Sequence, residues 1–376
     1  MSKNTTDNNP SLSNVPAVNV GEAVNRLSDM YCRVITAGLP LSTVPSVMMW
    51  GPPGVGKSQA VRQIADRIGS GTGKTVRVTD VRLLLFNPID LRGIPTANED
   101  KTLAVWLRPK IFDMDASAEV INILFLDEIS AAPQSVQAAA YQITLDRTVG
   151  EHRLPANCIV IAAGNRVTDK SVAYKMPKAL ANRMMHLEIE GSYEAWRAWA
   201  VSHGINEKII GFLAFRPDRL MAFNSSNDDL AFATPRAWEM VSNLMNSVSD
   251  NIDEIFTLIA GIVGSGVAVE FRTWAAVYNT LPEIEAIFDG IEHKVPKRTD
   301  ALYALISAMT KYASEHRDEM DRIANSITYA DKMPADFSTV LMQDYLNIEE
   351  GYRTKLMSVP EFTRWLRTKG ALLNGV

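Results

Sequence analysis

A glycine-rich loop at residues 51–58 carries the most specific chemical signal in the sequence. It fills every fixed position of the phosphate-binding pattern G-x-x-x-x-G-K-[ST]. Glycines allow a tight turn that directs backbone N–H groups at a phosphate, the lysine can reach the β and γ oxygens, and the serine hydroxyl can bind Mg²⁺. We therefore predict a nucleotide site formed by Gly51, Pro52, Pro53, Gly54, Val55, Gly56, Lys57 and Ser58, continued by Gln59.

Two adjacent carboxylates provide the second chemical signal. The apolar run 123–126 ends at Asp127 and Glu128, 70 residues after Lys57. A strand that is buried on both faces is apolar throughout, and its carboxyl end opens at the edge of the sheet beside the P-loop. There Asp127 can hold Mg²⁺, with Ser58, and Glu128 can orient the attacking water. The alternative is that both residues only begin the next helix, but their separation from the P-loop favours a Walker B strand.

The elements around these residues alternate between strand and helix up to about residue 190. Apolar β-type runs interleaved with helical periodicity predict an α/β fold with a parallel sheet sandwiched by helices, as in P-loop NTPases. The expected strands are Val47–Trp50, Thr75–Thr79, Ile121–Leu126, Cys158–Ala162 and Met185–Ile189. A helix is expected to follow the P-loop over 58–68.

Beyond Gly191 the sequence is helical in character. Expected helices cover 192–202, 207–215, 235–249 and 251–263, followed by periodic stretches at 299–324 and 360–373, with Pro334 as a break between them. The predicted organisation is a disordered N-terminal tail (1–18), an α/β nucleotide-binding core (19–190), an all-helical lid (191–290) and a helical C-terminal extension (291–376).

Asn165 follows the expected strand at 158–162. An asparagine after a strand is more often a turn former when taken alone. The order of P-loop, Asp-Glu pair and strand-terminal asparagine, however, resembles the AAA+ ATPases. That resemblance implies that Asn165 is a sensor that hydrogen-bonds the γ-phosphate or the attacking water.

Two arginines extend the resemblance. Arg183, in the segment 177–183 before the last expected strand, is similar to the family's arginine finger, which completes the nucleotide site of a neighbouring subunit. Arg236 lies at the start of a helix with Thr234 as N-cap and Pro235 at its first position, and it resembles the second sensor, which contacts the nucleotide of its own subunit. Taken alone, each arginine would be assigned to a surface salt bridge or a capped helix.

Two further segments are similar to the MoxR branch of this family. Residues 83–95 contain the pattern D-L-x-G-x-P and resemble its helix-2 insertion, and residues 147–154 resemble its short hairpin before the first sensor. In the family these elements face a central pore and engage clients. The alternative is that both are ordinary surface loops.

Composition restricts the functional classes. The 376 residues include 47% hydrophobic residues, and 38 Lys+Arg against 43 Asp+Glu give a net charge of -5, so no overall positive field favours nucleic acid. Cys32 and Cys158 form no C-x-x-C pattern, which favours a reducing compartment such as the cytoplasm. No apolar run reaches the roughly 18 residues of a membrane span, so we expect no membrane insertion. The five histidines lack metal-site spacing, and the absence of an N-K-x-D motif favours ATP over GTP.

The sequence thus predicts a Mg²⁺-dependent ATPase. The resemblance implies a homo-hexameric ring motor of MoxR type that remodels or activates a protein client, with a partner that contains a von Willebrand factor A domain. One alternative is a motor of the same fold that acts on nucleic acid, such as a helicase loader or a restriction or phage ATPase. Another is a scaffold that binds ATP but hardly hydrolyses it, which the presence of Glu128 disfavours.

Overall fold

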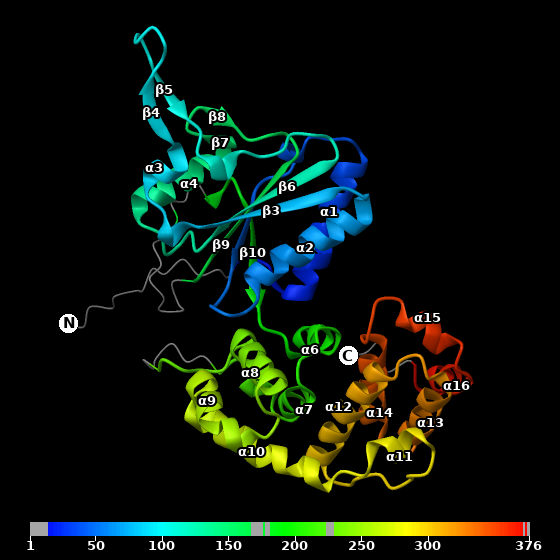
Figure 1. Ribbon diagram of the computed structural model, residues 1–376. Coiled ribbons are helices and arrows are strands. Elements are labelled where there is room, and N and C mark those ends of the chain that lie inside the picture. Colours follow the sequence, from blue (N-terminus) through cyan, green and yellow to red (C-terminus); the bar gives the residue numbers. More distant parts are fainter. Residues whose placement is uncertain (1–13, 167–175, 177–180, 223–228, 371–372, 374–376) are drawn as a thin grey trace, which may run out of the picture. The chain divides into compact units, whose positions relative to one another are not determined.

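The computed structural model describes residues 14–166, 176, 181–222, 229–370 and 373. They fall into two compact units that divide after Gly191. Figure 1 shows a sheet with helices in the first unit and helices alone in the second. Among the described residues, no helix combines the length and apolar character needed to cross a bilayer.

A six-stranded, all-parallel sheet forms the centre of the first unit. The spatial order is β1-β10-β2-β9-β6-β3. Strands β6 and β9 are buried along their whole length because they consist almost entirely of aliphatic, aromatic and small side chains. The bounds are β1 Ala17–Asn19, β2 Val47–Trp50, β3 Thr75–Arg82, β6 Val120–Asp127, β9 Cys158–Gly164 and β10 Met185–Glu190.

Helices cover both faces of this sheet. Helices α1 (Val20–Thr36) and α2 (Lys57–Thr72) pack against each other on one face, and α4 (Gln134–Asp146) lies on the other (Figure 1). The side chains of Val136 and Ala140 on α4 share a buried cluster with Met48, Leu124 and Val160 from three strands. The predicted α/β sandwich is therefore confirmed.

The described residues of the first unit also form two small hairpins and several short helical elements. The hairpins are β4 (Ile94–Ala97) with β5 (Ala104–Leu107), and β7 (Thr148–Val149) with β8 (His152–Arg153). The remaining short elements are α3 (Pro88–Arg92) and the 3₁₀ turns η2 (Leu41–Thr43), η3 (Leu83–Leu85) and η4 (Lys110–Phe112).

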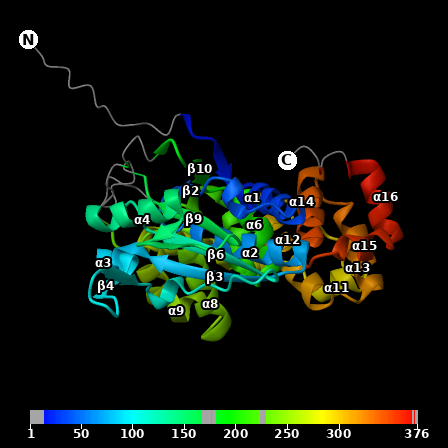
Figure 2. The ribbon, with the colours of Figure 1, turned by 90° about the horizontal axis from the view of Figure 1, so that it is seen from above.

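The described residues of the second unit form two hydrophobic cores that share one helix. Helix α12 contributes Ala301 and Ala304 to the first core and Leu305 and Met309 to the second. Figure 2 shows α13, α14, α15 and α16, which surround the second core, lying together. The bounds are α6 Tyr193–Ser202, α7 Glu207–Phe215, η6 Pro217–Arg219, α8 Pro235–Ser247, α9 Ile252–Val263, α10 Ser265–Ala275, η7 Ala276–Thr280, α11 Ile284–Phe288, α12 Thr299–Glu315, α13 Met320–Ala330, α14 Ala335–Leu346, α15 Tyr352–Met357 and α16 Pro360–Lys369.

A buried ion pair also joins the residues that the sequence divides into lid and extension. Arg197 on α6 donates to both carboxylate oxygens of Asp344 on α14, at 2.8 and 2.7 Å. The hydroxyls of Tyr193 and Thr310 complete this network. Burial alone would lower the pKa of the Arg197 guanidinium, but the attraction of Asp344 outweighs it and the pKa is raised.

Two sequence-based boundaries were wrong. Residues 1–18 were expected to be a disordered tail, yet Ala17–Asn19 forms the edge strand β1, which is too short for its single buried side chain, Val18, to produce a pattern. The single periodic stretch at 299–324 is two helices, because the chain leaves α12 at His316 and begins α13 at Met320.

Candidate nucleotide site

The P-loop connects the carboxyl end of β2 to the first turn of α2. Gly54 and Gly56 have φ angles of 78° and 106°, which residues other than glycine rarely adopt. A Cβ atom at Gly51 would lie 2.6 Å from the carbonyl oxygen of Ile189, so only glycine fits there without a shift. The glycines therefore set the shape of the loop, and α2 begins at Lys57 with its N-terminal N–H groups at the site.

Lys57 contacts both the loop and the end of β9. Its side chain is buried, and Nζ donates to the carbonyl oxygens of Gly51 and Pro52 at 2.7 and 3.0 Å and to Oδ1 of Asn165 at 3.0 Å. The backbone N–H of Asn165 donates to Oγ of Ser130 at 2.9 Å. The structure thus brings the predicted sensor into direct contact with the P-loop lysine.

Ser58 and Asp127 form the second contact of the site. The hydroxyl of Ser58 donates to Oδ2 of Asp127 at 3.1 Å, across 69 residues of sequence. A hydroxyl and a carboxylate in contact are hard oxygen ligands of the kind that Mg²⁺ prefers. These two residues therefore fit a magnesium ion held beside the phosphates of a nucleotide.

Glu128 adopts an unusual backbone conformation directly after β6. Its φ angle is 58°, in the left-handed region, and its N–H donates to Oδ1 of Asp127 at 2.9 Å. The next residue, Ile129, is held by a hydrogen bond from its N–H to the carbonyl oxygen of Ala163. Strained backbone of this kind is concentrated at functional sites, where the surrounding contacts maintain it.

Two residues near the site were not found from the sequence. Asp80 lies on β3, the neighbour of β6, and burial together with the negative charge of Asp127 raises its pKa. Ser130 positions Asn165, as described above. Neither residue belongs to a sequence motif, and only their positions relative to β6 in the folded sheet place them near the site.

The two predicted arginines lie in different units. Arg183 is exposed in the turn that precedes β10, while residues 177–180 of its predicted segment lie outside the described residues. Arg236 is the second residue of α8 and is exposed. The predicted N-cap is confirmed, since the Thr234 side chain accepts a hydrogen bond from the N–H of Ala237 at 3.1 Å, with Pro235 at the first helical position.

The expected insertion and the expected short hairpin are in contact with each other. The carboxylate of Glu151 accepts a hydrogen bond from the N–H of Trp106 at 3.0 Å, and Nε2 of His152 lies 2.6 Å from the Trp106 carbonyl oxygen. A Cβ atom at Gly150 would lie 2.6 Å from the carbonyl oxygen of Arg92, so the turn of β7–β8 rests against the end of α3. The two elements are therefore mechanically connected.

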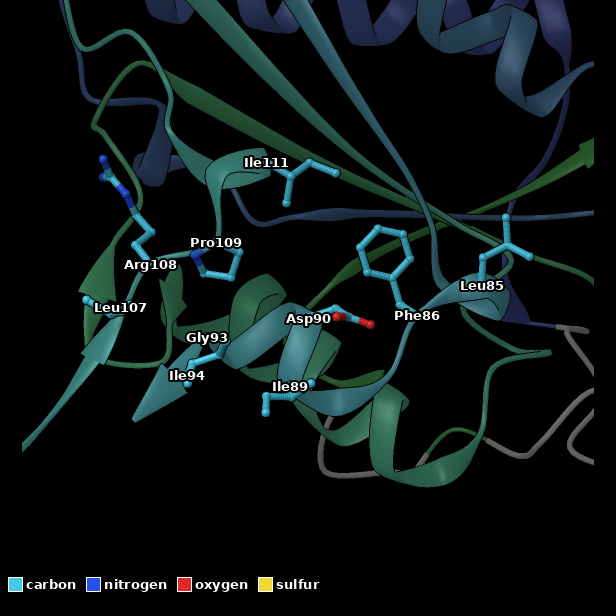
Figure 3. Close-up of a pocket in the computed structure, with 10 residues that line it drawn as sticks. All are labelled: Leu85, Phe86, Ile89, Asp90, Gly93, Ile94, Leu107, Arg108, Pro109 and Ile111. Atoms are coloured by element: carbon cyan, nitrogen blue, oxygen red, sulfur yellow. The ribbon is translucent and has the colours of Figure 1, made fainter. Parts of the chain in front are cut away.

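An apolar pocket of about 500 Å³ lies on the insertion. Several lining side chains are strongly exposed, including Leu85 at 74% and Ile94 at 58%. Figure 3 shows these residues and the guanidinium of Arg108, which extends away from the apolar side chains. The apolar lining includes Leu85, Phe86, Ile89, Ile94, Leu107 and Ile111.

Comparisons with known proteins place a family match over the first unit. Residues 46–186 match the model of the ATPase family associated with various cellular activities (AAA). The chain is 28% identical over 143 residues to the chaperone MoxR1 of Mycobacterium tuberculosis, covering 37% of this chain and 34% of that protein. It is 29% identical over 178 residues to the ATPase family gene 2 protein homolog B of Homo sapiens, covering 43% and 21%. The chain thus spans only about a fifth to a third of these relatives.

Solved structures show weaker likenesses. A mutant of RuvB from Thermotoga maritima is 14% identical, with 77% of this chain and 81% of that chain covered and a TM-score of 0.34. NtrX from Brucella abortus in complex with ADP is 15% identical, with 94% and 69% covered and a TM-score of 0.32. TM-scores this low carry no argument about function.

Proposed function

On the premise that this chain is a AAA+ ATPase of the MoxR type, we propose that it hydrolyses ATP to ADP and phosphate and uses the energy to remodel or activate a protein partner. The observation that carries the proposal is the contact set around the P-loop. Lys57 contacts Asn165 and Ser58 contacts Asp127, so four residues from three parts of the sequence meet at the P-loop.

Each residue has a distinct role in this proposal. Lys57 exchanges its carbonyl and Asn165 partners for the β and γ oxygens of ATP. Ser58 and Asp127 hold Mg²⁺, which supplies neutralisation of phosphate charge when it is bound. Glu128 orients and polarises the attacking water. Asn165, released by Lys57, hydrogen-bonds the γ-phosphate or that water.

The two arginines connect the site to the rest of the assembly. We assign Arg183 as a finger that enters the nucleotide site of a neighbouring subunit, because it is exposed and is the last residue of the segment that resembles the family's finger. Arg236 is assigned to the nucleotide of its own subunit. A finger in trans makes hydrolysis depend on a closed ring, for which the resemblance implies six subunits.

The insertion and hairpin form the proposed client surface. The insertion carries several strongly exposed apolar side chains around one pocket, and contiguous exposed apolar area marks interaction sites. The similarity to a protein called a chaperone supports a protein client. We further propose a partner with a von Willebrand factor A domain, as the MoxR resemblance implies, and a cytoplasmic location.

The experiment that tests this function measures ATPase rate against protein concentration for the wild type, Lys57→Ala, Glu128→Gln and Arg183→Ala. We expect the wild-type rate per subunit to rise with protein concentration. Each of the three variants should lose ATPase activity, and Glu128→Gln should still bind ATP. A wild-type ATPase rate as low as that of Glu128→Gln would indicate a scaffold that binds ATP, not a motor that hydrolyses it. A rate that is independent of concentration and of Arg183 would contradict the finger in trans. Salt-sensitive stimulation by DNA would favour the nucleic-acid alternative.

A further inference from the structure

His186 bridges the strand that enters the P-loop and the turn that carries Arg183. Trp50 is the last residue of β2, directly before Gly51, and its Nε1–H donates to Nδ1 of His186 at 3.0 Å. On the other side of the imidazole, Nε2 lies 2.7 Å from the carbonyl oxygen of Ala181. The indole and imidazole rings are stacked, with centroids 6.2 Å apart and planes 16° apart.

These partners permit only one form of the imidazole. An indole N–H can only donate and a carbonyl oxygen can only accept. Nδ1 must therefore be the acceptor and Nε2 must carry the proton, which is the neutral Nε2–H tautomer. The ring of His186 has a fixed orientation as well as a fixed position, since a flip would lose both hydrogen bonds.

The carbonyl oxygen of Ala181 is the point at which this bridge reaches Arg183. The same oxygen accepts a hydrogen bond from the N–H of Met184 at 3.3 Å, which closes a four-residue turn with Arg183 as its third residue. Immediately after the turn, the N–H of Met185 donates to the carbonyl oxygen of Ser46 at 2.9 Å. The side chain of His186 thus adds a tertiary anchor to this turn through its contact with Trp50.

A second bridge leaves β10 two residues later. Glu188, on the same side of the strand as His186 by the alternation of side chains, accepts from Nη1 of Arg166 at 2.7 Å, and both side chains are largely buried. Arg166 directly follows the proposed sensor Asn165. Strand β10 is therefore connected both to the residue that follows Asn165 and to the turn of Arg183.

We propose that His186 is a positioning residue that holds Arg183 in the geometry needed at a neighbouring subunit's nucleotide. Through Trp50, His186 fixes the turn of Arg183 relative to β2, the strand that leads into the P-loop of the same subunit. This inference rests on the proposed function, because it requires that Arg183 acts in trans. A displacement of about 1 Å at a catalytic group can cost about 100-fold in rate. Loss of the anchor is therefore expected to lower kcat strongly and to leave nucleotide binding by the same subunit unchanged.

Three substitutions separate the two arms of the bridge. In His186→Gln the amide nitrogen can take the place of Nε2 and still donate to Ala181, whereas in His186→Asn the amide oxygen can take the place of Nδ1 and accept only from Trp50. His186→Phe keeps a stacking ring and removes both hydrogen bonds. We expect His186→Gln to hydrolyse ATP near the wild-type rate, and the other two to lose about 100-fold in kcat. A fluorescent ADP analogue should bind all three with the wild-type affinity, which also shows that they are folded.

Mixed rings determine in which subunit the defect acts. His186→Phe subunits have intact P-loops, so mixing them with Lys57→Ala subunits, which keep their fingers, should restore hydrolysis above the sum of the separate rates. Mixing them with Arg183→Ala subunits should restore nothing, because neither subunit offers a placed finger.

Three outcomes would overturn the inference. Two of them concern only the role of His186, and the third would also refute the proposed finger in trans. Rescue of Arg183→Ala by His186→Phe, or equal loss in the Gln and Asn variants, would refute the positioning role alone. The control mixture of Lys57→Ala with Arg183→Ala must gain activity if the finger acts in trans. Absence of that gain would remove the trans arrangement, and the positioning role with it.

Discussion

Removal of Asp344 should strongly destabilise the second unit. The side chains of Arg197 and Asp344 are only 8% and 2% exposed, and two charge-assisted hydrogen bonds of 2.8 and 2.7 Å join them. Asp344 is the main cause of the raised pKa of Arg197, but an arginine guanidinium is not deprotonated in proteins, so Arg197 stays charged when Asp344 is replaced by alanine. A buried charge left without its partner costs about 3–5 kcal/mol. With a denaturant slope of about 2 kcal/mol/M, this corresponds to a fall of about 1.5–2.5 M in the urea midpoint.

The double substitution Arg197→Met with Asp344→Leu separates charge from packing. Replacing a buried ion pair by apolar side chains of similar volume is often neutral or stabilising. Tyr193, which accepts a hydrogen bond from Arg197, loses that partner at a cost of about 1 kcal/mol. We therefore expect the double variant to recover most of the stability that Asp344→Ala loses.

Tryptophan fluorescence during a urea titration measures this transition, since five of the seven tryptophans lie in the second unit. The matched control is Asp318→Ala, which removes an exposed partner of Lys355 and leaves Glu349 paired with that lysine. We expect no measurable shift for the control. The reasoning is refuted if Asp344→Ala shifts the midpoint no more than the control does, or if the double variant is no more stable than Asp344→Ala.

Three other predictions concern the first unit. Gly164→Ala would place a methyl group 2.8 Å from Oγ of Ser130 and displace Asn165. We expect the ATPase rate to fall at least 10-fold while ADP binding is retained. Unchanged ATPase kinetics would contradict this prediction. Burial raises the pKa of Cys158 to about 12, so the thiol stays protonated at pH 8; a thiol reagent should label it only in urea, as peptide mass spectrometry can check. Gly93 has a φ of 89°, and a Cβ atom there would lie 2.0 Å from a carbonyl oxygen of β5, so Gly93→Ala should disorder the insertion. We expect the client-stimulated ATPase rate to fall while the basal rate persists.

The centre of the sheet could be predicted from the sequence because strands β2, β6 and β9 are buried almost throughout. Continuous apolar runs located β2, β6 and β9 to within a few residues. The hairpin of β4 and β5 was missed because every residue of β4 is exposed, so no alternation of apolar and polar residues marks it. Likewise, the break between α12 and α13 contains neither glycine nor proline, and the helical periodicity continues through it.

The candidate site divides in the same way. Lys57, Ser58 and Asp127 were predicted because their chemistry fixes residue type and spacing, and the structure places them in contact with each other or with Asn165. Ser130 acts through one hydrogen bond and His186 through two, and each of these bonds could be made by several residue types. Such positions carry no motif, and they become visible only when the fold places them beside a residue that does.

The contacts of β10 suggest how one nucleotide site could influence the next. Asn165 accepts a hydrogen bond from Lys57 in this structure, and under the proposed function an ATP molecule that binds the lysine would release it. Arg166, the next residue, is tied through Glu188 to β10, which also carries His186 and hence the turn of Arg183. A shift of Asn165 toward a γ-phosphate would then displace the strand that follows Arg183, the proposed finger. If so, Glu188→Gln should weaken the dependence of each subunit's rate on the nucleotide state of its neighbours more than it weakens hydrolysis itself.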